Sequence, residues 1–347
     1  MANRPAPSCL IRILKECHVQ RRFVLQKLPR SAKYVYIFPQ SQVEALGNDI
    51  GNNESPVMLT LGSFFNLEES QPLQPTQGKK DIYRNQLLQL FYGSDVAKSS
   101  ENTRYSRSKG VIIAQPAISN RLRDGGAGTA HPEGMFWMTH TVPSFPDVNK
   151  PVWNPQNNNE GHLFLCLSVE ILHLSSLLDT LYYEQPFVYH SNYPKYAFEN
   201  ETLLDKCDSV RKMKCKLHSV YIASTEVTTA DGMTMSIISE NYRLAADIAS
   251  SWITEKFQTS FYSWNRRSTK EVAQIRDCYG NFQVENLNGP ITMAGTTIQH
   301  SEDNSRWILS PKGKIFEKVS GGAICIRNPQ IVNWFKQAMQ SSSVQRC

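Results

Sequence analysis

The sequence of 347 residues predicts a layered α/β fold, of the α+β kind, in which strands and helices are mixed along the whole chain. Three observations predict this class. Apolar runs of strand length recur in both halves, stretches with helical spacing lie between them, and polar segments separate the two. The chain has 40% hydrophobic and 20% charged residues, as an ordinary globular protein has, and is long enough to bury a large core. No run approaches the ~18 apolar residues of a membrane span.

The first half is predicted to consist mainly of strands. "RRFVLQKLP" (21–29) and "KYVYIFP" (33–39) are rich in β-branched and aromatic residues, which indicates two strands joined by a turn. "KGVIIAQ" is a short apolar strand, "MFWMTHTVPSFPD" a strand that runs into an extended segment, and "RNQLLQLFYG" a short helix or strand. Loops or a surface insertion are expected at 40–57, 66–80, 94–108 and 118–134.

The second half is predicted to alternate strands with clearer helices. "HLFLCLSV" is a buried strand, "SVYIAST", "MTMSIIS" and "QTSFYSW" are further strands, and "EILHLSSLLDTLYY" has helical spacing. The segment 205–219 is expected to be a basic loop. An amphipathic helix over 241–257 has Leu244, Ile248 and Trp252 on one face. In the last helix Asn328 is the cap, Pro329 takes the first turn, and the apolar stripe is Ile331, Trp334, Phe335 and Met339.

The net charge and the cysteine spacing do not decide between a secreted and a cytosolic protein, or between a polyanion-binding protein and one without such a partner. The net charge of +6 is compatible with a polyanion partner, which many proteins of similar charge lack. None of the eight cysteines forms a C-x-x-C pair, so the spacing fits either long-range disulfides or unrelated buried thiols. Sequons at Asn53 and Asn200 favour secretion slightly. The N-terminus has no apolar leader core, so the protein is either cytosolic or supplied here without its leader.

Several fragments, in order, resemble the deoxyribonuclease II family. "SKGVII" and "FWMTHTVPSFP" resemble its H-T-K-G-V and F-W-x-x-H-S-V-P-x-F-P segments, and "GHLFLCLS" resembles its central cysteine strand. "SEDNSRWILSPKG" resembles E-D-H-S-K-W-x-V-S-P-K-G, and "SGGAICIRNPQIVNWF" resembles the family's glycine-rich ending. The resemblance spans about Cys17 to Cys347 and implies a phospholipase-D-like pseudo-dimer. Its parts here would be an extension at 1–16 and two related halves at 17–155 and 156–347, with 149–161 as the boundary region.

In such a fold each half contributes one H-x-K motif to a shared site that needs no metal or cofactor. One His attacks phosphorus or acts as a base, the other protonates the leaving oxygen, and the lysines neutralise phosphoryl charge. The resemblance places the first motif on Arg107, Ser108 and Lys109, so its Lys is kept and its His is Arg. It places the second motif on Asn304, Ser305 and Arg306, where both working residues differ.

The exchanged residues argue against family chemistry. Arg107 cannot deprotonate and Asn304 cannot attack phosphorus or carry a proton. His140 matches the third family His and is either a site remnant or a structural residue. His300 lies four residues before Asn304 and is interpreted as an exposed loop residue, although a bulge could bring it closer. After "SPKG" a polar family segment is missing.

Arg107, Lys109, Arg306 and Lys312 would leave the former active-site cleft cationic and able to bind a polyanion without cutting it. The other interpretation is that these charges pair with Glu302, Asp303 or solvent. The five cations of the basic loop are expected to form a solvated face. They are Lys206, Arg211, Lys212, Lys214 and Lys216.

The resemblance also implies disulfides, because the family pairs its cysteines across each half. The corresponding pairs are Cys17–Cys166 and Cys278–Cys347, with Cys207–Cys215 as a local bridge and Cys325 left without its family partner. This favours an oxidising compartment, either extracellular or lysosomal.

The sequence therefore predicts a secreted, inactive deoxyribonuclease II-like protein that binds DNA, another polyanion or a protein partner. The alternatives are a metal-independent acid endonuclease rebuilt around His140 and His300, and a purely structural interaction protein.

Overall fold

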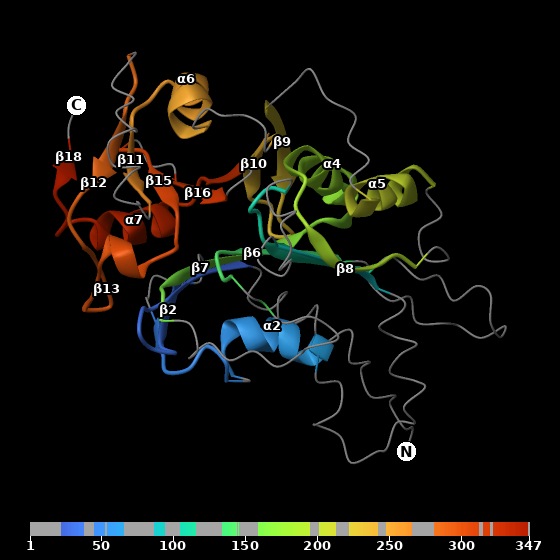
Figure 1. Cartoon of the computed structure of the whole chain (residues 1–347), viewed down its shortest axis with the longest axis horizontal. Coiled ribbons are helices and arrows are strands. Elements are labelled where there is room, and N and C mark those ends of the chain that lie inside the picture. The colour runs from blue at the N-terminus through green and yellow to red at the C-terminus, as the bar shows by residue number, and fades with distance from the viewer. Residues whose placement is uncertain are drawn as a thin grey trace.

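The computed structural model describes residues 22–37, 45–52, 54–65, 87–93, 105–115, 134–143, 145, 159–194, 201–212, 222–241, 248–265, 281–311, 315–319 and 322–345. Its strands form two eight-stranded sheets and one two-stranded hairpin (Figure 1). Strands and helices are mixed in both halves, so the predicted α/β layered fold is confirmed.

The first sheet is antiparallel throughout and has the strand order β3-β2-β1-β7-β6-β5-β4-β8. Its strands are β1 (Arg22–Lys27), β2 (Tyr34–Ile37), β3 (Ala45–Gly47), β4 (Leu88–Tyr92), β5 (Gly110–Gln115), β6 (Gly134–His140), β7 (His162–Val169) and β8 (Val188–Asn192). The predicted strands of the first half are confirmed, and "RNQLLQLFYG" contains a strand rather than a helix.

The second sheet has the order β18-β12-β11-β15-β16-β17-β10-β9, in which the β11–β12 pair is parallel. Its strands are β9 (Ile222–Thr228), β10 (Thr234–Glu240), β11 (Phe261–Trp264), β12 (Val284–Leu287), β15 (Trp307–Leu309), β16 (Ile315–Val319), β17 (Gly322–Ile326) and β18 (Val344–Gln345). The hairpin joins β13 (Ile291–Met293) to β14 (Thr296–Ile298).

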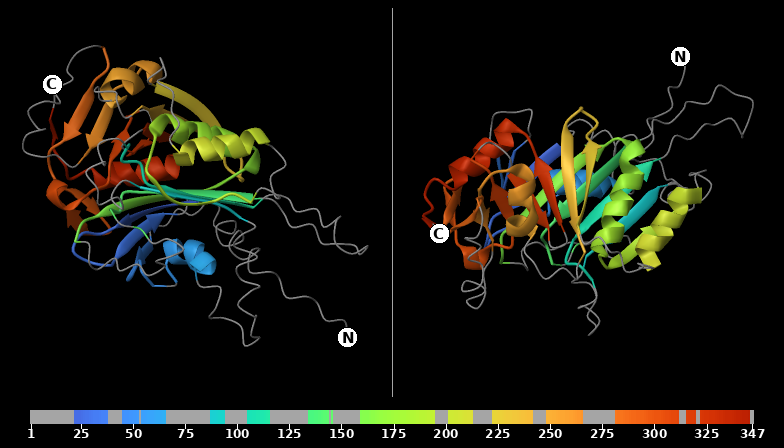
Figure 2. Two further views of the ribbon diagram at one scale, coloured as in Figure 1. Left: turned by 45° about the vertical axis from the view of Figure 1, so that its right-hand side comes forward. Right: turned by 90° about the horizontal axis from the view of Figure 1, so that it is seen from above.

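The helices cover both faces of the first sheet. Figures 1 and 2 show α2 on one face, and α4, α5 and the second sheet on the other. The helices are α2 (Pro56–Phe65), α4 (Leu174–Glu184), α5 (Glu201–Lys212), α6 (Thr254–Phe257) and α7 (Pro329–Ala338). Three short helices are η5 (Ile171–His173), the π-helix η6 (Ala249–Ile253) and η8 (His300–Glu302). Within the described residues, no helix has both the length and the apolar character that crossing a membrane requires.

The core divides across the first sheet because successive strand residues face opposite sides. On β6, Phe136 and Met138 pack in the cluster that contains Leu61 of α2. Trp137 packs in the larger cluster, which also contains Leu178 of α4 and residues of the second sheet. The first sheet is therefore the middle layer, between α2 on one face and the second sheet with α4 and α5 on the other.

Two predicted helices are confirmed. α4 follows the helical spacing of "EILHLSSLLDTLYY". α7 begins after Asn328, whose side-chain oxygen accepts hydrogen bonds from the backbone N–H groups of Gln330 and Ile331, both at 3.0 Å. The helix predicted over 241–257 is described from Ile248 onward, as η6 followed by α6, and Leu244 lies outside the described residues.

Two loop predictions are wrong. The segment 40–57 contains β3 and the start of α2, where the Ser55 hydroxyl accepts from the backbone N–H of Met58 at 3.1 Å and acts as a cap. The first part of the predicted basic loop is α5, because Cys207 and Val210 are buried against the rest of the protein.

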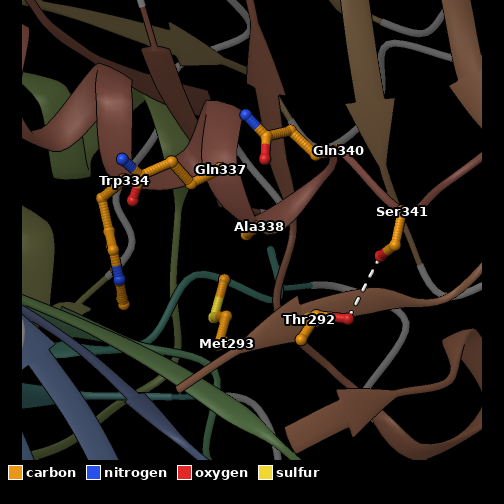
Figure 3. Close-up of a pocket in the computed structure, with 7 residues that line it drawn as sticks. All are labelled: Thr292, Met293, Trp334, Gln337, Ala338, Gln340 and Ser341. Atoms are coloured by element: carbon orange, nitrogen blue, oxygen red, sulfur yellow. Dashed lines mark hydrogen bonds between the residues drawn. The ribbon is translucent and has the colours of Figure 1, made fainter. Parts of the chain in front are cut away.

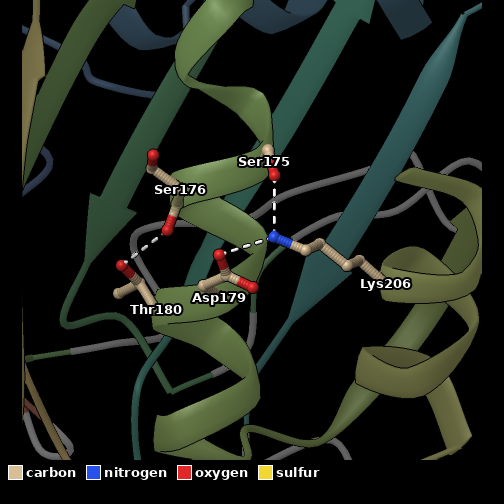
Figure 4. Close-up of polar contacts among 5 residues, drawn as sticks. All are labelled: Ser175, Ser176, Asp179, Thr180 and Lys206. Atoms are coloured by element: carbon tan, nitrogen blue, oxygen red, sulfur yellow. Dashed lines mark hydrogen bonds and ion pairs between the residues drawn. The ribbon is translucent and has the colours of Figure 1, made fainter. Parts of the chain in front are cut away.

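Three of the five cations predicted to form a solvated face lie on α5, and each pairs with a carboxylate of the protein. The Lys206 ammonium donates to the Asp179 carboxylate at 2.6 Å and to the Ser175 hydroxyl at 2.8 Å, which ties α5 to α4 (Figure 4). Arg211 and Lys212 both pair with Asp208 one turn earlier. Lys214 and Lys216 lie outside the described residues.

The sheets divide the chain later than the predicted boundary at residue 155. β7 and β8 follow that boundary, yet both belong to the first sheet, where β7 lies between β1 and β6. The apolar run of β7 is buried on both faces, and a central position in the sheet provides that burial. The second sheet begins only with β9.

Candidate functional site

The candidate site lies at one edge of the first sheet, where four adjacent strands begin or end. β1 ends at Lys27, β7 begins at His162, β6 ends at His140, and β5 begins at Gly110 directly after the first motif. Lys27 is paired with His162 in the antiparallel ladder, so these strand ends are level. We call this region, together with residues 303–306 that contact it, the motif edge.

The second motif reaches the motif edge through Gly161. The backbone N–H of Asn304 donates to the Gly161 carbonyl at 2.9 Å, and Gly161 forms an isolated β-bridge with Asp303. A Cβ atom on residue 161 would lie 2.6 Å from Oδ1 of Asp303. Only glycine therefore allows this close approach of the two segments.

The first motif crosses the edge in an extended segment. Arg107 is exposed, Ser108 is buried, and Lys109 is half-buried. The backbone N–H of Ser106 donates to the Gln185 carbonyl at 3.0 Å, so the segment lies along the chain that leaves α4. Alternation places Arg107 and Lys109 on the side opposite to Ser108.

His140 is buried beside the first motif. Its backbone N–H donates to the Lys109 carbonyl at 3.2 Å, and its ring stacks on Phe145 with centroids 4.3 Å apart. Burial holds the pKa of His140 well below its usual value, and the nearby charges of Lys109 and His162 lower it further. His162 is itself fully buried, with Nδ1 3.3 Å from the Thr141 hydroxyl. Burial therefore favours the neutral form of the His140 imidazole.

The second motif is engaged by protein groups. The Asn304 amide donates to the Glu160 carboxylate. Ser305 is fully buried, Arg306 is half-buried, and Trp307 begins β15 directly afterwards. Asn304 thus faces a carboxylate of its own protein.

Asp303 is the centre of the contact between the halves. It is buried and accepts from the Gln26 amide of β1 at 3.0 Å and from the Trp264 indole of β11 at 2.7 Å. The Ser305 backbone N–H donates to it at 3.0 Å and the Ser305 hydroxyl at 2.5 Å. One carboxylate therefore joins strands of both sheets.

Lys27 adds a buried cation to the same joint. Its ammonium donates to the Glu160 carbonyl at 2.9 Å and to the Leu28 carbonyl at 3.2 Å. Burial lowers the pKa of Lys27 to about 8, although the charges of Asp303 and Glu160 oppose this shift. Lys27 and Asp303 are therefore complementary charges within one buried network.

Glu184 lies behind the first motif at the end of α4. Burial raises the pKa of its carboxyl to about 8, the Ser108 hydroxyl opposes this shift by hydrogen bonding, and the Glu240 carboxylate adds to it. Sequence reasoning missed Glu184, Lys27 and His162, and it considered Asp303 only as a partner for cations. The available signal was a charged or titratable residue at the end of an apolar run.

His300 is not the exposed loop residue that the sequence predicted. It is half-buried in η8, its ring stacks on Trp264 with centroids 3.8 Å apart, and its Nδ1 lies 3.1 Å from the Asn265 carbonyl. Stacking on the Trp264 ring buries part of the His300 imidazole.

Several predicted site residues lie outside the described residues: Lys312, Asn53, Asn200, Cys17, Cys215, Cys278 and Cys347. Each predicted disulfide includes one of these cysteines, so the pairings stay predictions. Cys166 and Cys325 are buried in β7 and β17. Cys207 is a buried thiol in α5, and burial raises its pKa to about 12.

A cavity of about 270 Å³ lies between β13 and the end of α7, and Figure 3 shows its lining. The lining is uncharged and includes none of the motif residues; it consists of Thr292, Met293, Trp334, Gln337, Ala338, Gln340 and Ser341. Within the described part of the chain, no group of three or more His, Cys, Asp or Glu side chains is placed to hold a metal ion.

Comparison with known proteins identifies the family of the chain. The family model described as deoxyribonuclease II matches residues 21–347. Deoxyribonuclease-2-alpha of Mus musculus is 24% identical over 291 residues, which are 78% of this chain and 74% of the relative. Cell-death-related nuclease 7 of Caenorhabditis elegans is 24% identical over 329 residues, which are 88% of this chain and 80% of the relative. Since the match extends from β1 to the C-terminus and includes both motif segments, the chain belongs to the deoxyribonuclease II family.

Proposed function

We propose that this chain is a non-catalytic member of its family that binds DNA or a similar polyanion at the motif edge. The observation that carries the proposal is the residue content of the two motifs. Cationic Arg107, Lys109 and Arg306 are present, and neither motif contains an imidazole. Cations bind phosphate groups, whereas cleavage also requires a nucleophile and a proton donor.

The geometry supports the loss of cleavage. Arg107 stays protonated at any relevant pH, so it can neither attack phosphorus nor accept a proton. The Asn304 amide is held by the Glu160 carboxylate, and an amide has no proton that it can transfer at useful rates. Groups that act as one catalytic unit lose most of their effect when any member is lost, and here both imidazoles are replaced.

The first motif supports polyanion binding. Arg107 is exposed and Lys109 is half-buried, while Ser108 between them is buried, so both cations can face one phosphate backbone. The relatives are named as deoxyribonucleases, which makes DNA the first polyanion to test. Binding of this kind loses affinity as salt rises, because counterions released from DNA contribute to it.

The second candidate function is acid endonuclease activity at a rebuilt site. The observation that favours it is the presence of His140 and His162 at the ends of adjacent strands. Both rings are buried, and burial lowers the pKa of His140, which disfavours the protonated imidazole that the family reaction needs.

Fold and compartment belong to the same proposal. Each motif directly precedes a strand, β5 in the first sheet and β15 in the second, which supports a pseudo-dimer of two related halves. Family membership and the predicted disulfides support an extracellular or lysosomal location, with Asn53 and Asn200 as proposed glycosylation sites.

The proposal is tested by DNA binding as a function of salt. Fluorescence anisotropy with a labelled duplex should give a linear fall of log affinity with log salt concentration. Arg107→Ala with Lys109→Ala should reduce the slope by about two, since each phosphate contact contributes about one. Arg211→Ala is the matched control, because Arg211 already pairs with Asp208 on α5. An unchanged slope in the double variant, or no binding by the wild type, would contradict the proposal.

A further inference from the structure

Glu184 is a buried carboxyl that contacts the first motif and has no role in the function proposed above. It is the last residue of α4 and is 4% exposed. Gln185 then takes a left-handed conformation with φ of 55°, and its backbone N–H donates to the Leu181 carbonyl at 2.8 Å. This turn ends the helix and places Glu184 immediately before the segment to which Ser106 is bonded.

The surroundings of Glu184 come from three other elements. The Ser108 hydroxyl of the first motif hydrogen-bonds its carboxyl, and the Glu240 carboxylate at the end of β10 faces it. The backbone of β17 also approaches closely, since a Cβ atom on Gly322 would lie 2.8 Å from Oε1 of Glu184 and 2.2 Å from the Ile238 carbonyl oxygen. The carboxyl is therefore enclosed between the first motif and the second sheet.

Burial and the Glu240 carboxylate favour the neutral form of the carboxyl, whereas the Ser108 hydrogen bond favours the charged form. A buried carboxylate beside Glu240 would be destabilised by desolvation and by repulsion between like charges. A protonated carboxyl can both donate to and accept from its neighbours. The raised pKa of Glu184, at about 8, agrees with this arrangement.

We propose that Glu184 is a positioning residue for the first motif, and that its carboxyl holds Ser108 so that Arg107 and Lys109 project toward a bound polyanion. This inference rests on the proposed function for its purpose, while the positioning itself can be tested without any ligand. When the contact between Glu184 and Ser108 is lost, the segment 105–110 loosens and polyanion binding weakens.

Hydrogen exchange tests the positioning directly, on the full chain at pH 6. The amides of 105–110 should exchange at least tenfold faster in Glu184→Ala than in the wild type, and at the wild-type rate in Glu184→Gln, whose amide can still bond Ser108. Should Glu184→Ala fail to fold, Ser108→Ala removes the other partner and should accelerate exchange in the same segment. Unchanged exchange in the variant that folds would overturn the inference.

DNA binding tests the purpose of the positioning. At pH 6 the affinity of Glu184→Ala for a duplex should be several-fold lower than that of the wild type, and Glu184→Gln should match the wild type. Equal affinities of Glu184→Ala and the wild type would overturn the role of this contact in binding. Absence of DNA binding by the wild type would contradict the proposed function, and hydrogen exchange would then decide the positioning alone.

Discussion

The two motif segments share one contact, but the charges around that contact differ. In each, the central serine is buried and bonds a carboxyl, Glu184 for Ser108 and Asp303 for Ser305. Asp303 also accepts from groups of both sheets and faces the cation of Lys27, whereas the second charged group that faces Glu184 is another carboxylate.

This difference separates the roles of the two motifs. Asn304 bonds Glu160 and belongs to the joint between the sheets, so this position of the second motif contributes a contact within the protein. Arg107 is exposed and remains available to a ligand. The comparison therefore predicts that changes around the second motif affect stability, while changes in the first motif affect binding.

The largest expected effect is that of Asp303→Ala. It removes one of the two carboxylates that favour the charged form of Lys27, the other being Glu160, and it leaves the Trp264 and Gln26 donors without that acceptor. The unfolding free energy should therefore fall by about 3–5 kcal/mol. Urea denaturation measures it. Asp179→Asn, which breaks the half-exposed pair with Lys206, should cost under ~1 kcal/mol. Equal losses of unfolding free energy in the two variants would show that the buried Asp303 contacts stabilise the protein no more than a half-exposed ion pair does.

Lys27→Met should change how stability depends on pH. The pKa of Lys27 is about 8 in the folded protein and close to 10.5 when unfolded, so the unfolded state binds more protons between these values. Wild-type stability should therefore rise relative to the variant, by up to ~3 kcal/mol, as pH increases from 8 to 10.5. Parallel stability curves across this window would show that Lys27 is not a buried cation.

Asn304→Asp should lower the unfolding free energy, because it places a second negative charge at the second motif. A carboxylate facing Glu160 repels it and loses the amide donor, at a cost of about 1.5–3 kcal/mol at pH 7 that shrinks near pH 4, where carboxylates become protonated. Arg107→Gln should change stability by under ~0.5 kcal/mol, because the side chain is exposed. Thermal melts at both pH values measure this pair. A larger effect of Arg107→Gln would reverse the assigned roles.

The smallest expected difference is between the two serines. Ser305→Ala removes a hydrogen bond to a charged group and should cost about 1.5–3 kcal/mol, whereas Ser108→Ala removes one to a neutral carboxyl and should cost about 0.5–1.5 kcal/mol. Denaturation midpoints of the two variants at pH 6 give the order. The opposite order would mean that Glu184 carries a charge in the folded protein.

The strands and the two capped helices could be predicted because each carries its own local signal. The apolar run of β7 and the cap at Asn328 are of this kind. The helix α5 was missed because its basic residues hid the apolar spacing of Cys207 and Val210, and because Asp179, the partner of Lys206, is close to it only in the fold.

The site could be predicted in part for a similar reason. Sequence motifs placed Arg107, Lys109 and Asn304, and the structure brings the second motif to the strand edge beside the first. The burial of Lys27, Glu184 and Asp303 depends on contacts between segments up to 277 residues apart, as in the Gln26–Asp303 bond. No local pattern carries such information.

The most direct test of the central claim is plasmid digestion by the purified, disulfide-intact protein near pH 5 with a chelator present, beside His140→Ala. The account predicts no cleavage by folded protein that still binds DNA in a salt-dependent manner. Cleavage by the wild type that is lost in His140→Ala would contradict it, and would show an active nuclease rebuilt around the buried imidazole.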